Sequence, residues 1–158
     1  MGPPDKAVLL RVLGAAGGGR TTFAVSQAAE ILATDERRLV VIDTLGHGAN
    51  SAIERHGLGE RSIFKIETSA NLVLAVSRHL IASGGVACVI VDDLPGLDFG
   101  QGGDQWGRTK AVAGFVQSLS GIALAFKTSL ILVDRSSDFG TRPPLGFRDE
   151  FVAEKQSA

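Results

Sequence analysis

A glycine-rich stretch between an apolar run and a helical pattern is the feature that most constrains the fold of this chain. The stretch reads Gly-Ala-Ala-Gly-Gly-Gly-Arg-Thr-Thr over residues 14–22, after the apolar run 7–13 and at the start of a helical pattern over 20–34. This arrangement is typical of a loop whose backbone N–H groups surround a phosphate, with a lysine on the outer phosphates and a hydroxyl residue on Mg²⁺. Here Arg20 stands at the lysine position and Thr21 supplies the hydroxyl. The pattern predicts a strand, a phosphate-binding loop and a helix in direct succession.

The composition is that of one globular domain. Its 158 residues are 44% apolar, enough to bury a core, and the net charge of −1 gives no overall positive field that would attract nucleic acid or an anionic membrane. No apolar run approaches the roughly 20 residues that cross a bilayer, and no signal peptide is visible. We therefore expect a cytoplasmic protein, or a nuclear one in a eukaryote, without membrane association. Cys88, the single cysteine, is expected to pack inside the sheet as a small apolar residue.

Short runs rich in β-branched or leucine residues alternate with longer helical patterns along the chain. The expected strands lie at 7–13, 39–43, 62–67, 87–92 and 129–134, and the expected helices at 20–34, 49–57, 70–83 and 107–126. Nearly continuous apolar strands joined by helices indicate a parallel sheet that is covered on both faces. The sequence thus predicts an α/β fold with a parallel sheet of about five strands flanked by helices on both faces.

Two segments lack the patterns of regular structure. Residues 95–107 are rich in glycine and show no periodicity, which predicts a mobile loop with nothing to pack. Residues 141–158 follow the expected nucleotide-binding core at 1–140 and include two consecutive prolines. We expect this tail to be disordered or ordered by a partner, although residues 148–155 have the composition to form a short helix.

Aspartates end three of the expected strands, at Asp43, Asp92 and Asp134. In open parallel sheets, ligands bind at the carboxyl ends of the strands. Asp92 follows four apolar residues, the pattern of a second metal anchor, and its carboxylate would hold Mg²⁺ through water opposite Thr21. The alternative interpretation is that Asp92 only caps the loop after its strand.

Over residues 8–140 the chain resembles the ATPase core of the RecA/RadA recombinase family. The blocks that carry the resemblance occur in the family's order and spacing, at 14–22, 41–46, 89–92, 106–108 and 130–135. The resemblance implies a RecA-like P-loop NTPase fold, with the fifth strand between the strands that end at the phosphate loop and at Asp92. It also implies ATP at subunit interfaces and two DNA-binding loops, which follow the fourth and fifth strands.

The resemblance also implies which residues hold the nucleotide. It assigns Mg²⁺ to Thr21 and Asp92. The residues assigned to ATP are those of the loop, the start of the next helix and the end of the fifth strand: Gly14, Gly17, Gly18, Gly19, Arg20, Thr21, Thr22 and Arg135.

Three parts of the family's catalytic machinery differ in this chain. Leu45 occupies the position of the glutamate that orients the attacking water, and loss of a general base commonly costs roughly 10²–10⁴-fold in rate. The Asn-Gln pair at the end of the fifth strand is replaced by Asp134 and Arg135. Arg20 replaces a compact ammonium with a bulkier planar guanidinium. Together these changes indicate a relaxed demand for hydrolysis.

Two further interpretations of the site stay open. Asp93 follows Asp92 directly, where other phosphate-loop ATPases place a catalytic glutamate, so Asp93 is a candidate relocated base. Arg20 and Arg135 can pair with phosphates, or they can pair with Asp134 and Asp92. The second arrangement would be a self-neutralised cluster of ion pairs that needs no nucleotide.

The segments that correspond to the DNA-binding loops carry few cations. The segment 95–110 gains Arg108 and Lys110 only at its end, and 136–148 contains two arginines. Two or three cations predict weak, salt-sensitive contact with DNA at most.

Three functions are compatible with these residues. The first is a protein that binds ATP and Mg²⁺ with slow or no hydrolysis and acts as an accessory in DNA recombination or repair. Its partner would be a RecA-family protein, another repair protein or a second copy. The second is a protein-interaction scaffold with a vestigial nucleotide site, and the third is an active motor ATPase with Asp93 as its base. The joint presence of Gly19, Thr21 and Asp92 favours the first.

Overall fold

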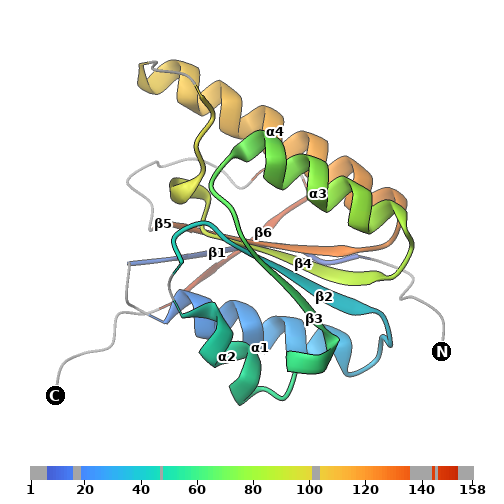
Figure 1. The fold of residues 1–158 in the computed structure, drawn as a ribbon. Helices are drawn as coiled ribbons and strands as arrows, with labels where there is room; N and C mark the ends of the chain where they lie inside the picture. The colour runs from blue at the N-terminus through green and yellow to red at the C-terminus, as the bar shows by residue number, and fades with distance from the viewer. Residues whose placement is uncertain are drawn as a thin grey trace, which may run out of the picture.

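The first five strands along the chain form where the sequence is rich in leucine, valine and isoleucine, and they assemble into one parallel sheet (Figure 1). The computed structural model describes residues 7–15, 19–46, 48–100, 104–135, 144 and 146–152, and within them the sheet has the order β3-β2-β4-β5-β1-β6. The strands are β1 (Leu9–Gly14), β2 (Arg38–Asp43), β3 (Ser62–Ile66), β4 (Val86–Asp92), β5 (Ser129–Arg135) and β6 (Arg148–Phe151). The helices are α1 (Arg20–Leu32), α2 (Ala49–Arg55), α3 (Ala70–Ala82) and α4 (Gln105–Ala125), with 3₁₀ turns η1 (Gly59–Arg61) and η2 (Leu94–Gly96).

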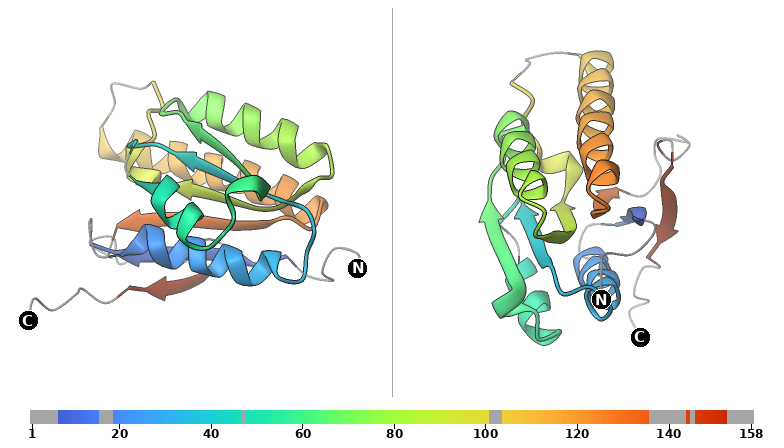
Figure 2. Two further views of the ribbon diagram at one scale, coloured as in Figure 1. Left: turned by 60° about the horizontal axis from the view of Figure 1, so that its bottom comes forward. Right: turned by 90° about the vertical axis from the view of Figure 1, so that its right-hand side faces the viewer.

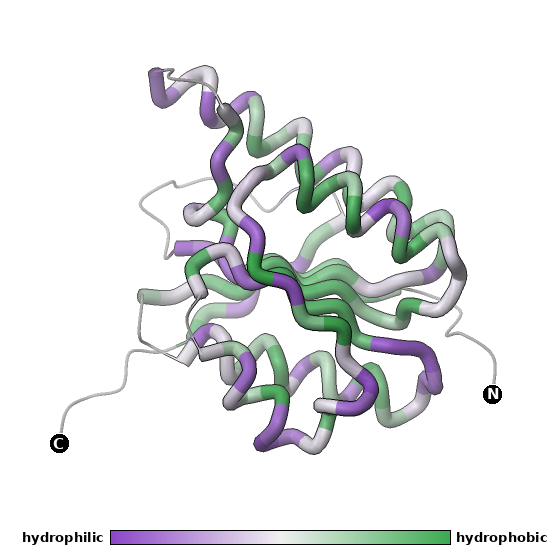
Figure 3. The backbone as a smooth tube through the Cα atoms, viewed as in Figure 1, coloured by the Kyte–Doolittle hydropathy of each residue, from purple (hydrophilic) through white to green (hydrophobic). Residues whose placement is uncertain are grey.

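Helices cover both faces of the sheet, α1 and α2 on one side and α3 and α4 on the other (Figures 1 and 2). Successive side chains of a strand point to opposite faces, so β5 sends Leu130 and Leu132 into one core layer and Ile131 and Val133 into the other. Figure 3 shows these apolar strands at the centre of the molecule, between helices in which hydrophobic and hydrophilic residues alternate. Burial on both faces explains why the strands read as nearly continuous apolar runs.

The predicted α/β architecture is confirmed. The strands are parallel, helices flank both faces, and β5 lies between β4 and β1, as the resemblance implies. The expected strand and helix bounds lie within two residues of those observed. No helix among the described residues is both long and apolar enough to cross a membrane.

The end of the chain departs from the prediction, because residues 148–151 form a strand and not a helix. β6 pairs in parallel with β1, which raises the sheet from the expected five strands to six within the described residues. Arg11 of β1 donates hydrogen bonds to both carboxylate oxygens of Asp149, at 2.8 and 2.7 Å, and Val152 N–H donates to the Leu13 carbonyl. These contacts with β1 outweigh any local helical preference. Apart from 144 and 146–152, the predicted tail lies outside the described residues.

The prediction that segment 95–107 has nothing to pack is wrong for its first half. Leu97 is buried in the core layer beneath α3 and α4, and the Phe99 ring meets the Phe115 ring edge-on, with centroids 6.1 Å apart. The Asp98 backbone also exchanges hydrogen bonds with the segment that precedes α3, donating to the Thr68 carbonyl and accepting from Ala70 N–H. The apolar side chains thus fix this segment without any periodic pattern. Residues 101–103 lie outside the described part.

Candidate functional site

The carboxyl ends of β1, β2, β4 and β5 lie at one edge of the sheet, and most of the predicted site residues are found there. The strand register places Asp43 beside Asp92, and Leu13, one residue before the end of β1, beside Asp134. α1 begins just beyond β1, so its first turn faces this edge (Figure 1). Gly14 ends β1 and Gly19 precedes α1, whereas the predicted phosphate-loop residues Gly17 and Gly18 lie outside the described residues.

The start of α1 has the backbone geometry of an anion site. Gly19 has a φ of +93°, a left-handed conformation that side chains other than glycine rarely adopt. No side chain caps the helix, and its first turn contains no acidic residue. The first N–H groups of a helix have no partner within the helix, and the helix dipole adds partial positive charge at this end. Such an end favours phosphate oxygens.

Thr21 and Asp92 meet at this edge, as predicted from the sequence. The Thr21 hydroxyl donates a hydrogen bond of 2.6 Å to the Asp92 carboxylate. Burial raises the pKa of the Asp92 carboxyl, and the nearby charges of Asp43 and Asp93 raise it further, against the hydrogen bond from Thr21 and the charge of Arg20. A cation at this position would relieve that repulsion.

The donor set at this edge fits Mg²⁺ bound together with phosphate, and not a metal site made by protein alone. Among the described residues, no group of three histidine, cysteine, aspartate or glutamate side chains is placed to hold a metal ion. Mg²⁺ usually keeps several waters and binds through one or two carboxylates together with phosphate oxygens. Thr21 and Asp92 would fill the protein's share of such a coordination sphere.

Arg20 points into the protein and is 7% exposed. Its Nη2 donates to Asp93 Oδ2 at 3.1 Å, and its Nη1 donates to the main-chain carbonyl of Asp134 at 2.5 Å. An ion pair at this edge was one of the two arrangements left open by the sequence. The carboxylate partner, however, is Asp93 and not Asp92 or Asp134.

Both carboxylate oxygens of Asp93 already have protein partners. Oδ2 accepts from Arg20, and Oδ1 accepts from Gly96 N–H at 2.8 Å, at the start of η2. The Thr44 side chain binds the backbone of Asp93: Thr44 Oγ1 accepts a hydrogen bond from Asp93 N–H and donates one to the Asp93 carbonyl. Asp93 is 3% exposed, so water has little access to its carboxylate. Its role as a relocated base stays a prediction.

Leu45 lies at the loop after β2, with 48% of its surface exposed. The loop is held by Asp43, whose Oδ1 accepts from the N–H groups of Leu45 and Gly46 at 3.0 and 2.7 Å. The Leu45 side chain lies against η2, because a Cβ added to Gly96 would come within 2.9 Å of Leu45 Cδ2. A hydrocarbon side chain therefore occupies the position where the resemblance expects a carboxylate.

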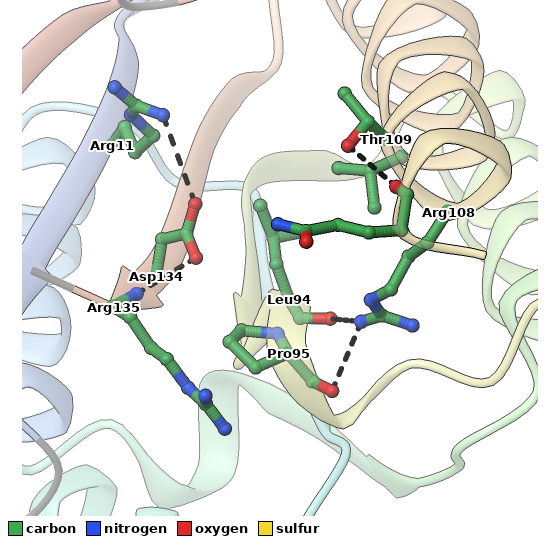
Figure 4. A pocket seen from close by; sticks show the side chains of 9 residues that line it. Arg11, Leu94, Pro95, Arg108, Thr109, Asp134 and Arg135 are labelled. Carbon is green, nitrogen blue, oxygen red and sulfur yellow. Dashed lines mark hydrogen bonds and ion pairs between the residues drawn. The ribbon is translucent and has the colours of Figure 1, made fainter. Parts of the chain in front are cut away.

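Two of the predicted phosphate ligands lie at the periphery. Thr22 is exposed in the first turn of α1. Arg135 is exposed at the end of β5, where its N–H donates to Asp134 Oδ1 at 2.8 Å, and its side chain lines a cavity between β5 and η2 (Figure 4). The structure thus brings together Arg20, Thr21 and Asp92 from the predicted set, with Asp93 behind them.

Sequence reasoning missed two residues that organise this edge, Thr44 and Arg11. The Thr44 hydroxyl forms two hydrogen bonds with the Asp93 backbone in the turn after β4, and nothing in the local sequence around Thr44 indicates this contact. Arg11 is 8% exposed in β1, where it binds Asp149 in a bidentate pair and lies 3.8 Å from the Asp134 carboxylate. A charged residue inside the apolar run 7–13 was the available signal, because a buried charge requires a partner.

Comparison of the chain with models of protein families and with curated proteins finds no match. Its function is therefore inferred from the chemistry of this edge of the sheet.

Proposed function

We propose that this chain is a RecA-like P-loop protein that binds ATP with Mg²⁺ and hydrolyses it slowly or not at all. The observation that carries the proposal is the 2.6 Å contact between the Thr21 hydroxyl at the start of α1 and the Asp92 carboxylate at the end of β4. In phosphate-loop NTPases, a hydroxyl and a carboxylate in these two places hold Mg²⁺. The strand order β4-β5-β1 supports the same assignment, because the resemblance implies it.

Each residue at this edge has a role in the proposed complex. The N–H groups at the start of α1 receive phosphate oxygens, and Gly19 gives the backbone the turn that exposes them. Thr21 and Asp92 position the ion, which supplies positive charge next to the phosphates. The Asp92 carboxylate feels the negative charges of Asp43 and Asp93 as well as the positive charge of Arg20, so a divalent cation here would offset the repulsion among the carboxylates.

Arg20 contacts phosphate only after it leaves its present partners. The guanidinium exchanges the Asp93 carboxylate and the Asp134 carbonyl for phosphate oxygens, another charge-assisted contact. Opening this buried pair opposes binding, so we expect a modest affinity, in the micromolar range. Hydrolysis is slow because Leu45 cannot polarise water and both Asp93 oxygens are engaged.

The proposed cellular role is that of an accessory in DNA recombination or repair, in which bound nucleotide stabilises the chain against a partner protein or a second copy. The resemblance of the five sequence blocks to the RecA/RadA family supports this role. Net charge and the few cations after β4 and β5 support at most a weak contact with DNA.

One observation favours the second candidate, a scaffold with a vestigial site. The buried Arg20–Asp93 pair balances its own charge without any ligand. Nucleotide binding separates the two functions, because a vestigial site leaves this pair closed in the presence of ATP.

Calorimetric titration with ATP tests the proposal. We expect binding with Mg²⁺ that weakens at least about tenfold with EDTA, or after Thr21→Val, which replaces the hydroxyl with a methyl group. Thr34→Val, just beyond the other end of α1, is the matched control and should bind like the unsubstituted chain. If the folded chain gives no heat of binding at millimolar ATP, the nucleotide-binding function is excluded and the scaffold function remains. Turnover that Asp93→Asn abolishes would instead support the motor ATPase.

A further inference from the structure

A cavity of about 300 Å³ opens between the ends of β1 and β5 on one side and η2 and the start of α4 on the other (Figure 4). From the residues that line it, we infer that it binds a small organic phosphate monoester with an apolar body. The inference does not depend on nucleotide binding at α1. Leu94 and Val112, which line the cavity, pack with the core layer beneath α3 and α4, whereas α1 packs on the opposite face.

The cavity has an apolar surface that suits the body of such a ligand. Leu94 and Pro95 of η2 and Val112 of α4 contribute hydrocarbon side chains to its lining. Figure 4 shows Leu94 and Pro95 on the wall that faces β5. An apolar ligand group placed there would exchange contact with water for contact with these side chains, which favours binding.

Arg108 places a fixed positive charge on the η2 and α4 wall. Its guanidinium donates to the main-chain carbonyls of Leu94, Pro95 and Leu97, at 3.4, 3.1 and 3.0 Å, and lies 5.3 Å from the centre of the Phe99 ring. These partners are all neutral. Within the described part of the chain, no carboxylate lies within ion-pair distance of Arg108. The charge is therefore held in place but not neutralised.

Arg135 places a second positive charge on the opposite wall. Its side chain extends outward from the end of β5 (Figure 4), and it forms no ion pair with any described residue. Arg11 and Asp134 also line this wall, where Arg11 pairs with Asp149 and lies 3.8 Å from the Asp134 carboxylate, so one guanidinium faces two carboxylates. Arg108 and Arg135 thus both line one cavity, and neither forms an ion pair with a carboxylate among the described residues.

Two unmatched guanidinium groups beside an apolar surface select an anion attached to a hydrocarbon body. Guanidinium groups donate paired hydrogen bonds that match the oxygens of phosphate. The volume lies at the lower limit of pockets for small organic ligands, which run from about 300 to 1,000 Å³. The cavity therefore suits a monoester with one ring or a short chain better than an extended strand.

Phenyl phosphate is the probe for this site, and NMR titration of the full chain locates where it binds. We expect a dissociation constant of about 1 mM or tighter, with shifts of the Leu94 and Val112 methyl signals. Inorganic phosphate, which lacks the ring, should bind more weakly at the same residues. Arg135→Gln should weaken phenyl phosphate about tenfold or more. We expect this variant to keep the fold, because the Arg135 side chain is exposed and forms no hydrogen bond or ion pair with a described residue.

Arg108→Gln should weaken the probe similarly, whereas Arg55→Gln, an exposed arginine on α2, should leave the affinity unchanged. Shifts confined to Gly19, Thr21 and Asp92 would overturn the inference, since the probe would then occupy the α1 site alone. An absence of shifts up to about 10 mM probe would also overturn it. So would an oligothymidylate that shifts the cavity residues and binds more tightly as its length grows, because that behaviour indicates an extended nucleic-acid surface.

Discussion

Replacing Arg20 by methionine tests whether this arginine is part of the folded core as well as of a binding site. Methionine keeps an unbranched apolar stem but removes the cation from the Asp93 carboxylate and the donor from the Asp134 carbonyl. The side chains of the pair are only 8% and 4% exposed, so water cannot readily replace these contacts. Removal of one partner of a buried pair costs about 3–5 kcal/mol. We expect a loss near the lower limit, about 3 kcal/mol, because Asp93 keeps its hydrogen bond from Gly96.

Urea unfolding followed by circular dichroism measures this loss. For a chain of this length, about 3 kcal/mol corresponds to a melting temperature lower by about 6–12 °C. Arg20→Lys should lose less, about 1–2 kcal/mol, because an ammonium can satisfy one of the two acceptors. Arg55→Met, on the exposed surface of α2, is the control and should change stability by less than about 0.5 kcal/mol.

A double-substitution cycle with Asp93→Asn isolates the pair. If the ion pair is the cause, the loss in Arg20→Met/Asp93→Asn should be smaller than the sum of the two single losses by about 2 kcal/mol. A loss below about 1 kcal/mol in Arg20→Met, or losses that simply add, would refute the reasoning. Arg20 would then be an exposed side chain in solution, free to reach a ligand without any structural cost.

Three further predictions concern single residues. Cys88 should resist alkylation until the chain unfolds, because burial raises the pKa of its thiol and blocks access; rapid labelling of the folded chain would contradict this. Asp92→Asn should stabilise the free chain at neutral pH, because burial raises the folded-state pKa of Asp92. This gain in stability should vanish as the pH falls below the unfolded pKa of about 3.9. Urea midpoints measured across this pH range test the gain. The same variant should lose the Mg²⁺-dependent gain in ATP affinity. Leu45→Glu should raise single-turnover ATP hydrolysis by about 10²-fold or more, and an unchanged rate would remove Leu45 as the cause of slow turnover.

The sequence predicted the main sheet because its strands are buried on both faces and so read as uninterrupted apolar runs. β6 has no such run: its residues Arg-Asp-Glu-Phe are mostly charged. It is a strand because β1 offers an open edge and because Arg11 binds Asp149, a contact between residues 138 positions apart in the chain. Local patterns carry no information on a contact of that kind.

The site shows the same division between local and long-range information. Thr21 and Asp92 follow directly from the helix start and the strand end that carry them, so their contact could be predicted. The partner of Arg20 could not, because it depends on how the turn after β4 directs Asp93 toward α1. That direction is set by Thr44, which is 49 residues away and holds both polar groups of the Asp93 backbone.

The measurement that tests the central claim most directly is NMR of the full chain with ATP and Mn²⁺ in place of Mg²⁺. Mn²⁺ broadens the signals of nuclei close to it, so it reports where the metal–nucleotide complex lies. The account predicts selective broadening of the backbone signals of Gly19, Thr21, Asp92 and Leu45, reversed by excess Mg²⁺, with little effect on Val112. Broadening centred on Arg108 and Arg135, or none at millimolar nucleotide, would contradict the claim that α1 and β4 together hold a nucleotide and its metal ion.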